Sequence, residues 1–284
     1  MKRFLRNGFH FLGYLLVLNL LFYLAIKKLY YDPYPEYDTS FDTFLLSDSH
    51  GDQLGIETEK IGLYNFSAPS DSYADMLRKV EFALRQGKPK RILLAVDDHM
   101  LSTYREEYNN LDRSIMFTQA TAFDSKWEWF NQRYTQRYLP LLNSKNRDVL
   151  LANIKGTLSS ATGFSKPWAE LSPAQRAEKA KARTSLHYTN VVTSDTLYRK
   201  LRSLLEICER QNVEVIGVRF PVTRTYLDHQ EHRGFKSDTV LSNRGIRIWD
   251  FKDVYLDEDG LFRDQDHLNQ QGVQKFIDLL GTKL

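Results

Sequence analysis

Two short polar segments near opposite ends of the chain contain residue types that could perform acyl chemistry. The first, SDSH at positions 47–50, directly follows the apolar run FDTFLL. The second, LFRDQDHLNQQG, places Asp264 three residues before His267, just ahead of an apolar helical pattern. A serine hydroxyl is a poor nucleophile at neutral pH unless an imidazole takes its proton and a carboxylate orients that imidazole. The pattern therefore makes Ser49, His267 and Asp264 a candidate nucleophile, general base and orienting acid.

The elements around these segments predict a parallel sheet covered by helices. Five β-type runs occur along the chain, and they read FDTFLL, KIGLYNFS, KRILLAV, NVEVIGVRF and GIRIWDF. Between and after them, apolar residues recur at helical spacing in residues 73–84, 197–208 and 273–280. Alternating strands and helices are typical of an α/β fold with a parallel sheet. Ligands bind such sheets beyond the carboxyl ends of the strands, where strand order reverses, and we expect Ser49 there.

The N-terminal segment is expected to anchor the chain in a membrane. Residues 9–26 contain no Asp, Glu, Lys or Arg, and about 18 such residues are close to the minimum for a spanning helix. Basic residues at positions 2, 3 and 6 precede this run, whereas only two lysines, at 27 and 28, follow it. The positive-inside rule then predicts a cytoplasmic N-terminus and a single-pass protein of the cell membrane, whose folded domain is periplasmic or on the cell surface. A cleaved signal peptide is the alternative, but no small-x-small site follows the run.

These patterns divide the chain into successive regions. We expect a cytoplasmic N-terminus at 1–8, a transmembrane anchor at 9–28, a linker rich in tyrosine and proline at 29–40, and the folded domain at 41–284. Residues 102–190 show no strand pattern and predict a helical insertion in that domain. Its aromatic and arginine residues at 127–138 suit either a glycan-binding cleft or packing of the insertion onto the sheet.

Composition and missing motifs argue against several kinds of partner and cofactor. The formal net charge of +3 over 284 residues is spread along the chain and favours no nucleic acid partner. The single cysteine, Cys208, lies on the apolar stripe of a predicted helix and is expected in the core. Neither standard glycine-rich phosphate loop is present, so we expect no nucleotide cofactor. Residues 97–99, DDH, could join the C-terminal acids around a metal, but their spacing fits no specific site and no metal is expected.

Taken together, the two polar segments resemble the first and last motif blocks of the SGNH, or GDSL-type, hydrolases. The family's Gly-Asp-Ser block aligns with residues 47–49, and its Asp-x-x-His block aligns with residues 264–267. The resemblance covers about residues 41–280. It implies a three-layer α/β/α fold with a parallel, flavodoxin-like sheet, and a triad of Ser49, His267 and Asp264. His50 is then expected to be structural, and Asp266 to be a neighbour that faces solvent.

The chain departs from the family in its two middle blocks, which supply oxyanion-hole donors. Ser67 stands where the family has a glycine, although its backbone N–H could still donate. Asp97 stands where the family has an asparagine, and an ionised carboxylate cannot donate a hydrogen bond. Loss of one oxyanion donor can cost about 2.7–4 kcal/mol in the barrier. Ser67 and Asp97 are therefore the candidate oxyanion positions, in altered form.

The layout of an anchor followed by this domain is similar to that of the teichoic-acid D-alanyl transfer protein and of the SGNH proteins of alginate and cellulose acetylation. That resemblance implies transfer of an acyl group, acetyl being the expected one, onto a cell-envelope polysaccharide. A membrane-bound acyltransferase partner would supply the acyl group. Two alternatives stay open: a serine esterase or deacetylase of the same glycans, and a non-catalytic envelope scaffold. Ser49 and His267 within hydrogen-bond reach would favour an enzyme, whereas wide separation would favour the scaffold.

Overall fold

The computed structural model describes residues 1–284 except 88, 163–165, 189–191 and 231–233, and it does not describe the side chains of 156–162. The chain forms two compact units. The anchor unit combines Met1–Pro35 with Thr118–Ser165, and the sheet unit combines Glu36–Phe117 with Lys166–Leu284. The segment 102–190, predicted as one insertion, thus contributes to both units.

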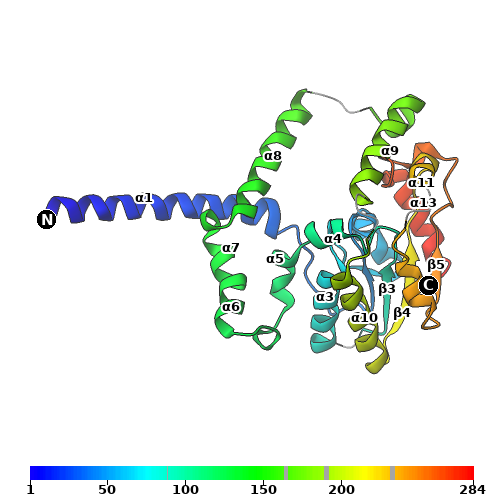
Figure 1. Ribbon diagram of the computed structural model, residues 1–284, viewed down its shortest axis with the longest axis horizontal. Coiled ribbons are helices and arrows are strands. Elements are labelled where there is room, and N and C mark those ends of the chain that lie inside the picture. The colour runs from blue at the N-terminus through cyan, green and yellow to red at the C-terminus, as the bar shows by residue number, and fades with distance from the viewer. Residues whose placement is uncertain (88, 163–165, 189–191, 231–233) are drawn as a thin grey trace. The chain divides into compact units, whose positions relative to one another are not determined.

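The sheet unit contains a five-stranded parallel sheet in the order β2-β1-β3-β4-β5 (Figure 1). The strands are β1 Thr43–Leu46, β2 Tyr64–Asn65, β3 Arg91–Ala95, β4 Glu214–Arg219 and β5 Ile248–Asp250. Each one lies inside a predicted β-type run, so the α/β prediction and all five strands are confirmed. This strand order is the flavodoxin-like one, whose switch point lies between β1 and β3.

Helices cover both faces of the sheet, as the α/β/α prediction requires. On one face, Leu45, Leu93 and Ile216 of three adjacent strands pack in the same buried cluster as Phe276 and Ile277 of α13, Gln270–Gly281. On the opposite side lie α3, Tyr73–Gln86, and α10, Asp195–Arg210, which pack against each other (Figure 1). All three helices match predicted helical patterns, and Cys208 of α10 is buried as expected.

Ten further helices and helical turns lie in the described part of the sheet unit. In chain order they are α2 Ser49–Asp52, η2 Gly55–Ile61, α4 Thr103–Glu107, α5 Leu111–Ser114, η3 Ile115–Phe117, η7 Trp168–Glu170, α9 Pro173–His187, α11 Arg224–Gln230, α12 Ser237–Ser242 and η8 Asp259–Leu261. Helix α9 begins as its sequence indicates, with Ser172 as the N-cap and Pro173 at the first position. It contributes an arginine to the site described below.

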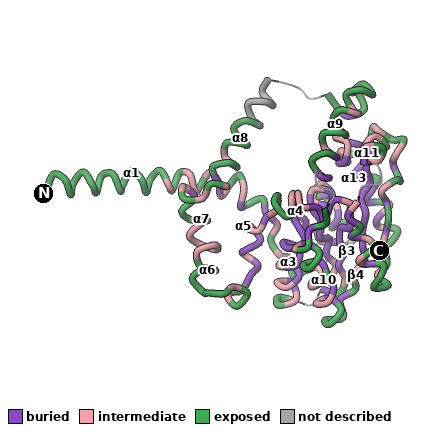
Figure 2. The backbone as a smooth tube through the Cα atoms, in the orientation of Figure 1, coloured by how far each residue is buried: buried purple, intermediate pink, exposed green. Residues whose placement is uncertain are grey.

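The anchor unit is built on one long apolar helix. Helix α1, Lys2–Ile26, continues as the π-helical turn η1, Lys27–Tyr31, and the combined helix is long and apolar enough to cross a membrane. Its residues are exposed along almost the whole length (Figure 2), as a lipid-facing helix requires. The other elements of this unit are η4 Ala120–Ala122, α6 Lys126–Phe130, η5 Asn131–Thr135, α7 Gln136–Tyr138, η6 Pro140–Leu142 and α8 Ser144–Thr162.

Candidate active site

The tight turn after β1 places Ser49 at the switch point of the sheet. Strand β1 ends at Leu46, and Asp48 caps the four-residue helix α2 by accepting a hydrogen bond from the His50 N–H at 3.0 Å. The Gly51 N–H donates to Ser47 Oγ at 3.0 Å, which tightens the turn further. Ser49 is therefore the first residue of α2, beyond the carboxyl end of a central strand.

A second loop, between η8 and α13, carries the candidate acid and base. Asn269 caps α13 by accepting from the Gly272 N–H at 3.0 Å, and its own N–H donates to the Leu261 carbonyl at 2.8 Å. A Cβ at position 272 would lie only 2.2 Å from that carbonyl oxygen, so glycine is needed for this close approach. The loop is thus held against the first turn of the last helix, where it presents His267.

The two loops bring the three predicted residues together. His267 Nε2 lies 2.9 Å from Ser49 Oγ, and His267 Nδ1 lies 2.8 Å from Asp264 Oδ1. Both separations are within hydrogen-bond range. His267 is buried, while Ser49 and Asp264 remain partly exposed. This arrangement is that of a nucleophile, a base and an orienting acid, and it leaves the serine open to a substrate.

Asp266 is buried, which corrects the expectation that it faces solvent. Its side chain has no exposed surface, and Oδ1 lies 3.2 Å from His267 Nδ1. The Arg183 Nε–H of α9 donates to Oδ2 at 2.8 Å, and this charge compensates for the loss of solvent. Burial alone would raise the pKa of Asp266, but the interactions with His267, His50 and Arg183 outweigh it and hold the pKa well below its usual value. Two carboxylates therefore approach the same imidazole nitrogen.

Burial and the two neighbouring carboxylates determine the pKa of His267. Burial lowers it, but the hydrogen bonds to Asp264 and Asp266 and the charge of Asp266 act in the opposite direction, and the net effect is a raised pKa. The same carboxylates would stabilise the imidazolium if His267 took a proton from Ser49.

A buried polar network lies beneath the triad. His50 Nδ1 lies 2.8 Å from Asp97 Oδ2, and His50 Nε2 lies 3.6 Å from Asp266 Oδ2, an ionic contact too long for a hydrogen bond. Asp48 pairs with Arg105 and lies 2.8 Å from His99 Nε2. Burial would lower the pKa of His50, but the charges of Asp48 and Asp97 raise it well above its ordinary value. The two carboxylates thus favour the imidazolium form of His50.

Neither expected oxyanion position offers a free donor. Both carboxylate oxygens of Asp97 are occupied as acceptors, Oδ2 beside His50 and Oδ1 receiving the Phe220 N–H at 2.9 Å. The Ser67 N–H already donates to Asn65 Oδ1 at 3.2 Å. Within the described part of the chain, the Ser49 N–H at the start of α2 has no hydrogen-bond acceptor. This N–H is therefore free to donate to a bound group beside the Ser49 hydroxyl.

Sequence reasoning missed the basic residues of this network, Arg105 and Arg183. Arg183 lies in the charged stretch AQRAEKAKAR, in which no residue stands out by type or spacing. His99 was singled out in sequence only as part of the DDH run after β3. Their roles in the network are recognisable only in the folded chain, where β1, β3, α9 and the C-terminal loop lie close together.

The same side chains include two groups with ligand atoms close enough to hold a metal ion, Asp48 with His50 and Asp97, and Asp264 with Asp266 and His267. Each group already has a cationic partner, because Arg105 pairs with Asp48 and Arg183 with Asp266. The absence of a metal from the reaction stays a prediction.

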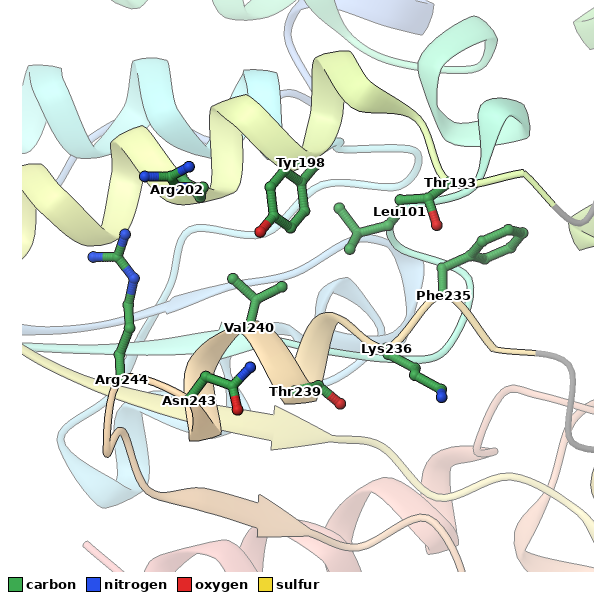
Figure 3. A pocket seen from close by; sticks show the side chains of 10 residues that line it. All are labelled: Leu101, Thr193, Tyr198, Arg202, Phe235, Lys236, Thr239, Val240, Asn243 and Arg244. Atoms are coloured by element: carbon green, nitrogen blue, oxygen red, sulfur yellow. The ribbon is translucent and has the colours of Figure 1, made fainter.

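A separate surface pocket of about 390 Å³ lies between α10 and α12 (Figure 3). Tyr198 and Arg202 of α10 face Thr239 and Arg244 across it, and Phe235 closes one end. None of the residues predicted for catalysis lines this pocket. Its arginines lie close to Glu206, so their charges are partly neutralised.

Comparison with known proteins gives limited similarity. No protein-family model matches the chain, and no curated protein matches it. A solved structure of a candidate lipolytic protein of the G-D-S-L family from Desulfitobacterium hafniense is 12% identical, with a TM-score of 0.42, over 86% of this chain and 99% of that one. A candidate acylhydrolase from Bacteroides fragilis is 8% identical, with a TM-score of 0.41, over 89% of this chain and 90% of that one. Similarity this low identifies neither family nor activity.

Proposed function

We propose that this protein is a serine acyltransferase or esterase that works through Ser49, His267 and Asp264. The observation that carries the proposal is the 2.9 Å separation of Ser49 Oγ and His267 Nε2, with Asp264 on the other imidazole nitrogen. Ser49 lies 218 positions before His267 in the chain, and Asp264 lies 3 positions before it. Their convergence at the switch point of the sheet supports an enzyme over a scaffold.

The chemistry proceeds in two steps. Ser49 Oγ attacks the carbonyl carbon of an acyl ester while His267 Nε2 takes the hydroxyl proton, which gives a tetrahedral oxyanion, and the old ester bond breaks when this intermediate collapses to the acyl-serine. The leaving oxygen receives the proton from His267. In the second step an acceptor hydroxyl attacks the acyl-serine, His267 takes its proton, and Ser49 is released with its proton restored.

The acceptor decides between transfer and hydrolysis. We propose a hydroxyl group of a cell-envelope polysaccharide, and hence transfer of an acyl group, with acetyl as the first candidate. Helix α1 supports this assignment, because a membrane anchor with an extracytoplasmic domain would hold Ser49 beside the envelope. A membrane-bound acyltransferase would then deliver the acyl group. If water is the acceptor, the protein is an esterase or deacetylase of the same glycans.

Labelling with a serine-directed fluorophosphonate tests the nucleophile. The full chain should react, Ser49→Ala should not, and Ser242→Ala should label like the wild type because Ser242 is an exposed serine of α12. Turnover of a small acetyl ester should fall by about 10⁶ in Ser49→Ala and comparably in His267→Ala. The double variant should be scarcely slower than either one, because the two residues act as one unit.

Mass spectrometry of envelope polysaccharides separates the acceptors. Cells that carry Ser49→Ala in place of the wild type should show lower polysaccharide acylation if the protein transfers acyl groups. Higher acylation would identify a deacetylase. Unchanged acylation together with unchanged fluorophosphonate labelling would refute the catalytic role of Ser49.

A further inference from the structure

The anchor unit holds the segment that connects α7 to η6 against the C-terminal half of α1. Asn19 of α1 donates a hydrogen bond from Nδ2 to the Tyr138 carbonyl at 2.9 Å. The rings of Tyr23 and Tyr138 also lie 5.2 Å apart. Asn19 comes seven residues before Ile26, the last residue of α1, which at 1.5 Å per residue is about 10 Å of helix. If α1 spans a bilayer, the contacting segment lies at bilayer depth as well.

The segment at this depth is apolar. Residues 138–142 read YLPLL, and we call them the elbow, because they join the end of α7 to η6. Three of their side chains are exposed, Tyr138 by 49%, Leu139 by 39% and Leu142 by 77%. Large apolar side chains so exposed beside a spanning helix indicate contact with lipid rather than water.

The backbone of the elbow is suited to an environment without water. The N–H groups of Leu139, Leu142 and Asn143 donate to the carbonyls of residues 135, 139 and 140 at 2.9–3.1 Å. Pro140 has no N–H, and the Tyr138 carbonyl receives the Asn19 amide. At membrane depth the backbone polar groups must be satisfied within the protein, as they are in helical turns such as η6. The elbow meets this condition at each of these groups.

Charged residues flank the elbow on both sides in the sequence. The Arg137 guanidinium lies over the ring of Tyr31, 4.6 Å from its centre, at the end of η1. Lys145 and Arg147 follow the elbow in the first turns of α8. Cations and aromatic rings with this placement are typical of the interface between lipid tails and headgroups.

We propose that the elbow, residues 138–142, inserts into the leaflet at the carboxyl end of α1 and forms a second membrane contact beside the anchor. The proposal rests on α1 spanning the membrane and is independent of the acyl chemistry at Ser49. The occupant of the elbow's apolar surface is lipid. This contact would fix the rotation of α1 and hold α6–α8 at the membrane surface.

Site-specific fluorescence quenching in a bilayer tests the insertion. The full chain carries one cysteine, Cys208, which is fully buried, so a bimane label attaches selectively to an introduced cysteine. Three variants are compared in phosphatidylcholine vesicles with iodide on both sides: Leu142→Cys in the elbow, Leu16→Cys in α1 and Tyr108→Cys in the sheet unit. All three positions are exposed, by 77%, 67% and 55%.

The label at Leu142 should behave like the one at Leu16. Nitroxide-labelled lipid should quench both, and iodide should quench both about tenfold less than the label at Tyr108, because charged ions are excluded from hydrocarbon. Equal iodide quenching at Leu142 and Tyr108, with Leu16 protected, would overturn the proposal. Protection of Leu142 from both quenchers would also overturn it, in favour of a protein contact. Iodide quenching at Leu16 would show that α1 does not span the bilayer, which overturns the proposal as well. It would not affect the proposed acyl chemistry at Ser49.

Discussion

At the scale of single residues, the site differs from a simple triad because two carboxylates approach one imidazole nitrogen. His267 Nδ1 carries a single proton when the ring is neutral and can donate it fully to only one acceptor. Asp264 lies closer, at 2.8 Å, and is partly exposed, whereas Asp266 lies at 3.2 Å and is fully buried. We infer that Asp264 orients the ring and that Asp266 contributes mainly a fixed negative charge.

The pH dependence of activity distinguishes these two roles. His267 must be neutral to accept the serine proton, so kcat/KM should fall on the acid side with an apparent pKa above 6.5, the ordinary value for histidine. Asp266→Asn removes the buried charge that raises this pKa, and the acid limb should move to lower pH. Asp264→Asn should lower kcat by up to about 10⁴, as loss of an orienting carboxylate does. Rates of acetyl-ester hydrolysis measured across the pH range give both quantities.

The control for this comparison is Asp278→Asn, which changes an exposed carboxylate of α13. This variant should leave both the acid limb of the pH profile of kcat/KM and the value of kcat unchanged. An acid limb that stays in place in Asp266→Asn would contradict the electrostatic role of Asp266.

Asp97 tests whether the altered oxyanion block can be restored by one substitution. In the structure both oxygens of Asp97 accept, from the Phe220 N–H and beside His50. An asparagine has only one accepting oxygen, so its NH₂ would face either the Phe220 N–H or His50 Nδ1, and that donor would lose its acceptor. Asp97→Asn should therefore fail to raise acetyl-ester hydrolysis and should reduce stability by about 3–5 kcal/mol, as broken buried ion pairs do. An increase in kcat with unchanged stability would show that the new amide reaches the oxyanion instead.

At the scale of elements, the position of the loop between η8 and α13 depends on how closely it approaches α13. Gly272 allows the Leu261 carbonyl to lie where a side chain would otherwise be. Gly272→Ala should displace this loop, cost about 1–3 kcal/mol of stability by overpacking, and reduce kcat/KM by about 10² through misplacement of His267. Gly260→Ala is the matched control, because a Cβ there meets nothing within 4 Å. Wild-type kinetics in Gly272→Ala would contradict this account of the loop.

The sequence predicted elements better than it predicted the site, and the difference has a physical reason. Strand and helix patterns are local, so all five strands and the main helices could be located. The run KIGLYNFS still shortened to two strand residues, because 60–61 belong to η2 and Gly62 turns the chain with a φ of 72°. Asp266 could not be placed, because its burial depends on Arg183, which lies 83 positions away in the sequence.

At the scale of the whole molecule, a few buried charges connect distant parts of the sheet unit. His50 follows β1, Asp97 follows β3, and Asp266 lies in the C-terminal loop, so the ring of His50 connects its own segment to two others. Asp266 in turn receives Arg183 from α9. Buried charges of this kind destabilise the fold when one partner is removed, because the other remains without solvent. The stability of the sheet unit should therefore depend on the charge of His50.

Unfolding measured across pH tests this dependence. Because the pKa of His50 is raised in the folded state, its stabilising effect is fully present below the unfolded pKa of about 6.5 and is lost as pH rises through the folded pKa. His50→Gln should lower the free energy of unfolding by about 3–5 kcal/mol near pH 6, and the difference from the wild type should shrink at alkaline pH. Urea unfolding of the detergent-solubilised chain, followed by near-ultraviolet circular dichroism, measures it, with His10→Gln in the anchor unit as the control. A difference that is constant from about pH 6 to pH 10 would mean that position 50 stabilises the fold through packing and not through its charge.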